Sequence, residues 1–222
     1  MISEAKLPLS GLRVLDLSRV LAGPYCGMVL SDLGAEVTKI EAPAGGDETR
    51  SWGPPFDDGI SAYFASCNRG KTSIVLDLKT SEDQTRLVEY VRQSDVLIHN
   101  FTPKVAKKLG VDKATLATIN ERLVVAAISG FGTQEPWAER PGYDLVIQAL
   151  SGFMAITGAK DSAPSKVGVA ITDVLTALFS VIGILAELVQ RQTFSEGTAS
   201  FKQIDVSLMH CAMASMVNVA QS

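Results

Sequence analysis

Short apolar runs alternate with helix-like stretches along the first 130 residues, and this alternation constrains the fold more than any other feature of the chain. Strand-like runs at Arg13–Leu17 and Ala35–Glu41 flank a segment that is helical in pattern up to about Leu33. Parallel strands need a crossover connection between them, usually a helix. The repeated unit therefore predicts an α/β fold, with a parallel sheet and flanking helices.

Further strands and helices are expected along the rest of the chain. The expected strands are Ser73–Leu78, Asp95–His99, Leu123–Ser129 and Ser200–Val206. Ser81 is expected to cap a helix, with Gln84 as its capping-box partner. Short helices are expected at Pro103–Leu109 and Lys113–Ile119, before a mainly helical region that covers Tyr143–Met154 and Asp173–Gln192.

The most apolar stretch, Val174–Ala186, is shorter than the roughly 20 residues that cross a bilayer. We therefore expect a buried helix there and no membrane partner. The prolines of the segment 42–59 exclude a regular helix or a central strand from it.

Charge and cysteine content exclude several functions. The net charge is −4 and no run of Lys and Arg occurs, so nucleic acid is a poor partner. Cys26, Cys67 and Cys211 show no metal-ligand spacing, which predicts reduced thiols and no metal site. No presequence is visible, so we expect an intracellular protein of the cytoplasm or the mitochondrial matrix.

Ligands of open parallel sheets bind beyond the carboxyl ends of the strands, and here the loops SRVLAGP, HNF and SGFG follow the strands. The first loop holds Gly23 where a dinucleotide-binding loop needs three glycines, which disfavours a nicotinamide cofactor. Lys79, Lys107 and Lys108 could bind a phosphate-bearing ligand or could simply form a solvated face.

Asp173 is the most informative acid, because it opens a strongly apolar helical run after the small residues VGVAIT. It could be a helix cap, or a nucleophile that the helix N-terminus keeps ionised in a dry pocket. Tyr143 and Asp144 follow a Pro-Gly turn and could either face a cleft or serve packing and capping. His99 fits a structural histidine better than a ligand-facing one.

Several ordered motifs together resemble the class III CoA-transferase family, which includes formyl-CoA transferase and the CaiB/BaiF-like proteins. The motifs are LSGLRVLDLSRVLAGP, DLGAEVTKIE, GGDETRSWGPPF, NRGKTSIVLDLK, SGFG, RPGYD and GVAITD, and they span almost the whole chain. The segments GGDETRSWGPPF and ITGAKDSAPSKVGVAITD are most similar to the dicarboxylate branch, the succinyl-CoA-dependent glutarate or hydroxymethylglutarate CoA-transferases.

The resemblance implies a Rossmann-like sheet and a catalytic role for Asp173. In such enzymes the aspartate of a GxxxxD motif attacks the acyl-CoA thioester, and an aspartyl anhydride and an aspartyl-CoA thioester follow. The motif positions imply contacts to CoA or substrate, in order along the chain, at Val20, Ala22, Leu76, Lys79, Asn100, Phe101, Lys108, Tyr143 and Asp144. Lys108 stands where some members have an arginine, so bidentate phosphate binding is lost there.

The same resemblance sets the partners. Acyl-CoA and a small, dicarboxylic acid are expected as substrates, with no tightly bound cofactor, and family members form interlocked homodimers. Residues 1–192 then form the N-terminal part of the large CoA-binding α/β domain with its long helix. Residues 193–222 begin the next strand–helix segment, which looks truncated, because nothing here matches the second half of the family with its glycine-rich loop.

Two alternatives remain beside CoA transfer. One is an acyl-CoA racemase or epimerase of the same family, which Gly142-Tyr143-Asp144 disfavours because that branch carries a GHD motif. The other is a catalytically silent, truncated homologue that binds a partner through exposed apolar surface.

Overall fold

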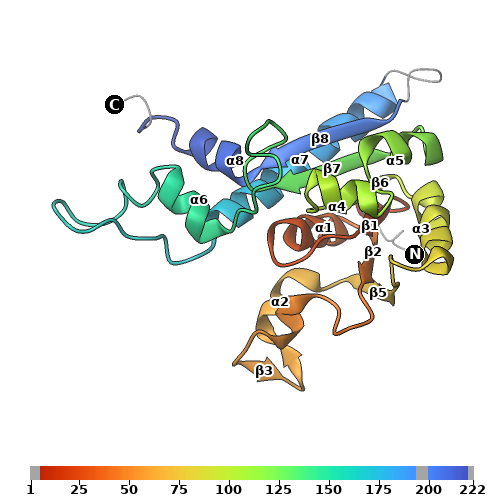
Figure 1. The fold of residues 1–222 in the computed structure, drawn as a ribbon, viewed down its shortest axis with the longest axis horizontal. Coiled ribbons are helices and arrows are strands. Elements are labelled where there is room, and N and C mark those ends of the chain that lie inside the picture. Colours follow the sequence, from red (N-terminus) through yellow and green to blue (C-terminus); the bar gives the residue numbers. More distant parts are fainter. Residues whose placement is uncertain (1–5, 194–199, 220–222) are drawn as a thin grey trace, which may run out of the picture.

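A six-stranded parallel sheet forms the centre of the molecule in the computed structural model, which describes residues 6–193 and 200–219 (Figure 1). The strands are β1 (Arg13–Asp16), β2 (Glu36–Glu41), β5 (Lys71–Val75), β6 (Val96–His99), β7 (Val124–Ser129) and β8 (Lys202–Ser207). Their order across the sheet is β5-β2-β1-β6-β7-β8. This is the doubly wound arrangement of a Rossmann-like fold, with its switch point between β1 and β6.

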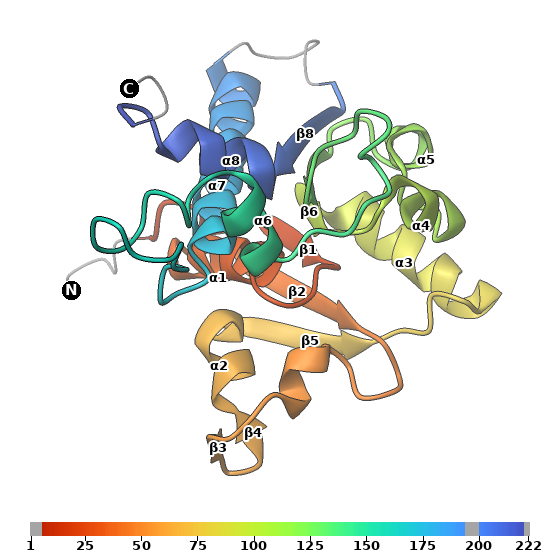
Figure 2. The same ribbon diagram turned by 60° about the vertical axis from the view of Figure 1, so that its left-hand side comes forward.

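Helices cover both faces of the sheet, as the alternation predicts. They are α1 (Ala22–Asp32), α2 (Ala62–Asn68), α3 (Ser81–Gln93), α4 (Pro103–Lys108), α5 (Lys113–Ile119), α6 (Asp144–Leu150), α7 (Ile171–Thr193) and α8 (Leu208–Ser215). In Figure 2, α1, α7 and α8 lie on one side of the strands, and α3, α4 and α5 lie on the other. Each side has its own apolar core, because neighbouring strand residues point to opposite faces.

Two predicted boundaries differ in the structure. The third strand, β5, begins at Lys71 and ends at Val75, earlier than expected. Thr80, not Ser81, caps α3, because its hydroxyl accepts a hydrogen bond from the Asp83 backbone N–H at 3.3 Å. The capping-box prediction for Gln84 is therefore wrong, and its side chain donates to the Leu78 carbonyl instead, at 3.1 Å.

The segment 42–59 contains no regular α-helix or central strand. It holds a short 3-10 helix, η1 (Glu48–Ser51), and the two-residue strand β3 (Phe56–Asp57), which pairs with β4 (Ile60–Ser61).

The predicted helix Tyr143–Met154 is shorter than expected, since α6 ends at Leu150.

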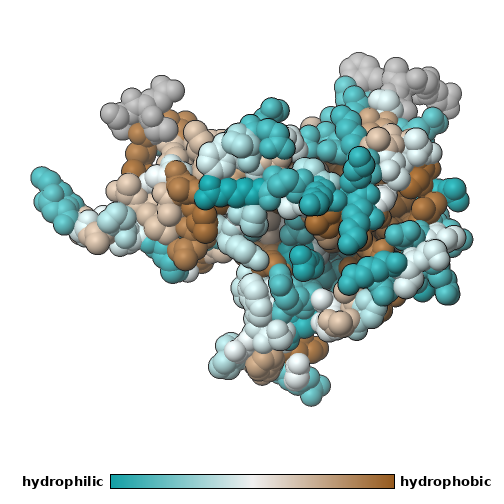
Figure 3. All heavy atoms as spheres, in the orientation of Figure 1, coloured by the Kyte–Doolittle hydropathy of each residue, from teal (hydrophilic) through white to brown (hydrophobic). Residues whose placement is uncertain are grey.

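The prediction that the apolar run of α7 is a buried helix is wrong in part, because only one side of the helix is buried. Its buried residues are Thr172, Thr176, Ala177, Ser180, Val181, Ile184 and Leu188. The opposite side exposes apolar residues, among them Ile182 at 61% and Val189 at 60%. Figure 3 shows further hydrophobic residues gathered around the neighbouring α6.

With 23 residues, α7 is long and apolar enough to cross a membrane, but the core helix of a soluble protein passes the same test.

Candidate active site

A cavity of about 230 Å³ lies beyond the carboxyl ends of β1, β6 and β7, beside the switch point of the sheet. Six of the residues implied by the family motifs line it: Val20, Ala22, Asn100, Phe101, Tyr143 and Asp173. They come from the loop after β1, the first residue of α1, the loop after β6, the turn before α6 and the first turn of α7. The fold thus joins positions as far apart in the sequence as Val20 and Asp173.

A second cavity of about 320 Å³ adjoins the first and is lined by Leu76 and Lys79. Arg19 and Phe101 line both cavities and so separate them. Of the remaining implied residues, neither Lys108 nor Asp144 lines either cavity. Lys108 is exposed in the last turn of α4.

Asp173 lies partly buried in the first turn of α7. Burial raises the pKa of its carboxyl, the nearby Asp144 carboxylate raises it further, and a hydrogen bond from the Ala22 backbone N–H opposes both, with a result of about 7. The nucleophile alternative expects the helix N-terminus to keep this acid ionised, and burial opposes that effect here. Burial is the largest influence on this carboxyl, so its pKa lies well above the ordinary value of an aspartate.

Asp144 holds the beginning of α7 in place. Its Oδ1 accepts hydrogen bonds from the backbone N–H of Thr172 at 2.8 Å and from the Thr172 hydroxyl at 2.7 Å. Its Oδ2 accepts one from the Gln148 side chain at 2.6 Å. Of the alternatives for this acid, the structure supports the capping role, although the cap belongs to α7 and not to the helix on which Asp144 lies.

Tyr143 faces outward, with 61% of its surface exposed, so it is not the packed tyrosine of the structural alternative. The preceding residue, Gly142, explains the path of the chain before Tyr143. A Cβ atom on Gly142 would lie 2.7 Å from the Cα of Gly130, which belongs to the SGFG loop. The two loops therefore cross backbone to backbone at the cavity, and a side chain at either glycine would push them apart.

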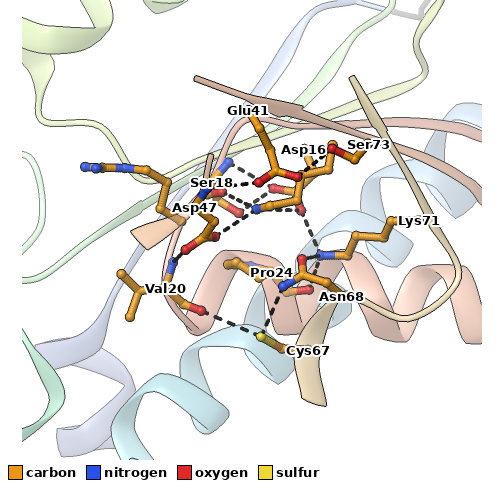
Figure 4. Close-up of polar contacts among 12 residues, drawn as sticks. Asp16, Ser18, Val20, Pro24, Glu41, Asp47, Cys67, Asn68, Lys71 and Ser73 are labelled. Atoms are coloured by element: carbon orange, nitrogen blue, oxygen red, sulfur yellow. Dashed lines mark hydrogen bonds and ion pairs between the residues drawn. The ribbon is translucent and has the colours of Figure 1, made fainter. Parts of the chain in front are cut away.

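A buried ionic cluster holds the loop after β1 (Figure 4). Asp16 is fully buried and accepts hydrogen bonds from the Lys71 ammonium at 2.9 Å and from the Ser18 backbone N–H at 2.9 Å. Lys71 also donates to the Pro24 carbonyl at 2.7 Å and to Asn68 at 2.8 Å. Burial alone would raise the pKa of Asp16, but the Lys71 and Lys39 ammonium groups and the hydrogen bond from Ser18 lower it to about 2.

The cluster continues through Lys39 to Asp47. The Lys39 ammonium donates to the Ser18 carbonyl at 2.7 Å and lies 3.1 Å from Asp47 Oδ2. Asp47 Oδ1 accepts a hydrogen bond from the Val20 backbone N–H at 3.4 Å. Val20 has a φ of 71°, a left-handed conformation that a β-branched residue rarely adopts, so the buried side chains hold the loop in a strained path.

Asn100 ties the same loop from the opposite side. Its side-chain amide donates to the Arg19 carbonyl at 2.8 Å and accepts from the Arg19 N–H at 3.1 Å. The loop that carries Ala22 toward Asp173 is therefore fixed at both edges.

Sequence reasoning missed the ionic cluster, although a signal was present. Asp16 follows the buried apolar residues Val14 and Leu15 in β1, and Lys39 lies near the buried Val37 and Ile40 in β2. A charged residue in a strand of a covered parallel sheet must be paired with an opposite charge, because burying it alone is costly.

His99 is a structural residue, as predicted. It is 4% exposed, its Nδ1 accepts a hydrogen bond from the Phe101 backbone N–H at 3.3 Å, and burial lowers its pKa to about 4, which keeps it neutral. Cys26, Cys67 and Cys211 are unpaired and buried, in line with reduced thiols. Within residues 6–193 and 200–219, no cluster of three or more His, Cys, Asp or Glu side chains could hold a metal ion.

Comparison with known proteins identifies the family. The family model described as CoA-transferase family III matches residues 9–222. The chain belongs to CoA-transferase family III. Among its relatives are a succinate–glutarate CoA-transferase of Agrobacterium fabrum, 44% identical over 96% of this chain, and a succinyl-CoA:glutarate CoA-transferase of Mus musculus, 41% identical over 98%. An acetyl-CoA:oxalate CoA-transferase of Acetobacter aceti is 43% identical over 96% of the chain.

The family III chain spans about half the length of these relatives, 54%, 49% and 54% respectively. Its fold matches the crystal structure of a CaiB/BaiF family protein from Brucella suis with a TM-score of 0.92 and 44% identity, over 97% of this chain and 57% of that one. The predicted α/β architecture with flanking helices is confirmed.

Proposed function

We propose that this chain supplies the nucleophile and the CoA-binding surface of a CoA-transferase that moves CoA between an acyl-CoA donor and a small dicarboxylic acid. Family membership and the relatives named for glutarate and oxalate support the substrate class. The observation that carries the proposal is a partly buried carboxyl, Asp173, on the wall of a cavity at the switch point of the sheet.

The first two steps move CoA from the donor to the protein. The Asp173 carboxylate attacks the thioester carbonyl, the C–S bond breaks, and a mixed anhydride and the CoA thiolate form. The thiolate then attacks the aspartyl carbonyl of the anhydride, which releases the donor acid as its carboxylate and leaves an aspartyl-CoA thioester.

The next two steps reverse this order with the acceptor. Its carboxylate attacks the aspartyl thioester carbonyl, which gives a second anhydride and frees the CoA thiolate. The thiolate attacks the acceptor's acyl carbonyl, so that the new acyl-CoA leaves and the Asp173 carboxylate is restored. The steps are a chain of acyl exchanges, and each begins from an activated acyl group.

The loop after β1 serves this chemistry through its backbone. The Ala22 N–H already donates to Asp173, so it lies where negative charge develops on the aspartyl oxygen during thiolate attack. The ionic cluster around Lys71 and Asp47 fixes that N–H before substrate arrives. A preorganised donor stabilises a transition state without a rearrangement during the reaction.

The adjoining cavity fits the nucleotide end of CoA in this proposal. Lys79 at its edge supplies a positive charge for a phosphate, and Phe101 lies between it and the cavity of Asp173. Lys108 is exposed on α4 and contributes a point charge where an arginine would bind two oxygens. The interlocked homodimer expected from the family remains part of the proposal.

The test is a transfer assay with the full-length protein and its Asp173→Asn variant, which keeps the size of the side chain and removes the nucleophile. Succinyl-CoA serves as donor, with glutarate and oxalate as acceptors. We expect transfer to fall by at least about 10³-fold in the variant, while the protein stays folded by circular dichroism. Unchanged transfer in Asp173→Asn would exclude the aspartyl route, and retained exchange of the α-proton without transfer would favour the racemase.

A further inference from the structure

The cavity of Asp173 is also lined by a charged residue, Arg140, that takes no part in the reaction steps above. Arg140 lines this cavity, and its guanidinium makes no hydrogen bond or ion pair with any residue that the structure describes. The side chain is exposed toward the cavity and solvent. An arginine with unpaired donors on the wall of the same cavity as Asp173 is available to an anionic ligand.

Two aromatic rings hold this guanidinium in place. Its central carbon lies 5.1 Å from the ring centre of Phe131 and 5.0 Å from that of Trp137. The two rings are themselves in contact, with centres 5.6 Å apart. A cation held over aromatic faces keeps the N–H groups at its edge free, so its position is set without occupying its donors.

The backbone fixes the same arrangement. Phe131 follows Gly130, and Arg140 lies two residues before Gly142, so the close crossing of the two glycines ties the guanidinium to the ring beneath it. A long side chain on a free loop would lose more conformational entropy on binding a ligand.

The other charged side chains around the cavity are Arg19, Glu48 and Asp173. Arg19 also lines the adjoining cavity, which is the one proposed for CoA, and its backbone carbonyl accepts a hydrogen bond from Asn100. We therefore assign Arg19 to the CoA-binding side. Arg140 is therefore the cation best placed to bind the acyl end of the substrate.

We propose that Arg140 binds the free carboxylate of a dicarboxylic substrate whose other end reacts at Asp173. The planar guanidinium matches a carboxylate with two parallel N–H···O bonds. Donor and acceptor acids pass through the same aspartyl site in turn, so one arginine serves both a succinyl donor and a dicarboxylic acceptor. This inference rests on the proposed function and names the group that selects its substrates.

The experiment compares a donor that carries this carboxylate with a donor that lacks it. In the full-length protein, the rate of aspartyl-CoA formation is measured with succinyl-CoA and with acetyl-CoA for the parent, Arg140→Gln and Arg140→Lys. We expect kcat/KM for succinyl-CoA to fall roughly 10- to 150-fold in Arg140→Gln, the equivalent of a lost charged hydrogen bond. The value for acetyl-CoA should stay within about 2-fold of the parent, and Arg140→Lys should fall between parent and Arg140→Gln for succinyl-CoA.

Inhibition by free CoA gives an independent readout, since CoA has the phosphates and lacks the carboxylate. Its inhibition constant should be unchanged in Arg140→Gln. Equal losses for both donors, or weaker inhibition by CoA, would show that Arg140 binds a phosphate and would overturn the inference. So would a succinyl-selective loss in the matched variant Arg19→Gln with none in Arg140→Gln. If the parent forms no aspartyl adduct from either donor, the proposed function itself fails and this inference falls with it.

Discussion

Replacing Lys71 with methionine should destabilise the fold strongly, because it removes one partner from a buried ionic cluster. The side chain is 2% exposed and its ammonium contacts Asp16, the Pro24 carbonyl and Asn68 within 2.9 Å. Methionine fills similar space and donates no hydrogen bond. Asp16 would then keep Ser18 and the more distant Lys39, 4.0 Å away. Leaving a buried charge without its partner costs about 3–5 kcal/mol of unfolding free energy.

The contribution of Asp16 to the free energy of unfolding can also be estimated from its dependence on pH. The pKa of Asp16 falls from 3.8 to about 2 on folding, so its contribution is present above pH 4 and disappears as the pH falls through 2. A shift of this size corresponds to about 2 kcal/mol. Asp16→Asn should therefore flatten the stability curve between pH 4 and pH 2 by about this amount.

Urea unfolding followed by circular dichroism measures both effects for Lys71→Met, Asp16→Asn and the double variant. Lys107→Met serves as the control, because Lys107 is an exposed lysine of α4. The double variant should lose less than the sum of the single variants, since neither charge is then left alone. A loss below about 1 kcal/mol in Lys71→Met, or strict additivity in the double variant, would refute the role given to the cluster.

Three further predictions concern the cavity itself. Asp144→Asn keeps an acceptor for Thr172 but removes the charge that helps to raise the pKa of Asp173. The midpoint of the pH–rate profile should therefore move below its parent value near 7, and initial rates at several pH values measure this. Asp173→Asn should be more stable than the parent at pH 8 and equal to it near pH 4. The reason is that a carboxyl with a raised pKa destabilises the folded protein as the pH rises from 4 to 7. Thermal unfolding at both pH values measures the difference. Gly130→Ala should destabilise the fold by about 1–3 kcal/mol, because the added Cβ would lie 2.6 Å from the Cα of Gly142, and urea unfolding measures this as well.

Local sequence patterns predicted the order of strands and helices well. Alternating runs such as Arg13–Leu17 and Leu123–Ser129 carry the periodicity of their own element, and the short connections leave few ways to join them. Errors at boundaries arose where neighbouring residues could play the same role. Thr80 and Ser81 both have a hydroxyl that can cap α3, and the contact that decides between them is set by the turn before the helix.

The contacts that build the site are long-range, and no local pattern contains them. Asp16 and Lys71 are 55 residues apart in the sequence, and Asp144 caps a helix that begins 27 residues later. The sequence pattern and the family resemblance both pointed to Asp173, but neither gave the extent to which burial raises its pKa, to about 7. That value depends on how α1 and α7 pack against each other, and these helices are far apart in the sequence.

Intact-mass spectrometry of the full-length protein after incubation with succinyl-CoA tests the proposed route most directly. Borohydride or hydroxylamine trapping followed by peptide mapping then locates any adduct. We expect an adduct at Asp173 that is absent from Asp173→Asn and forms faster as the pH rises through about 7, in step with the pKa of the carboxyl. An adduct at another residue, or active transfer with no trapped adduct, would contradict a covalent aspartyl mechanism.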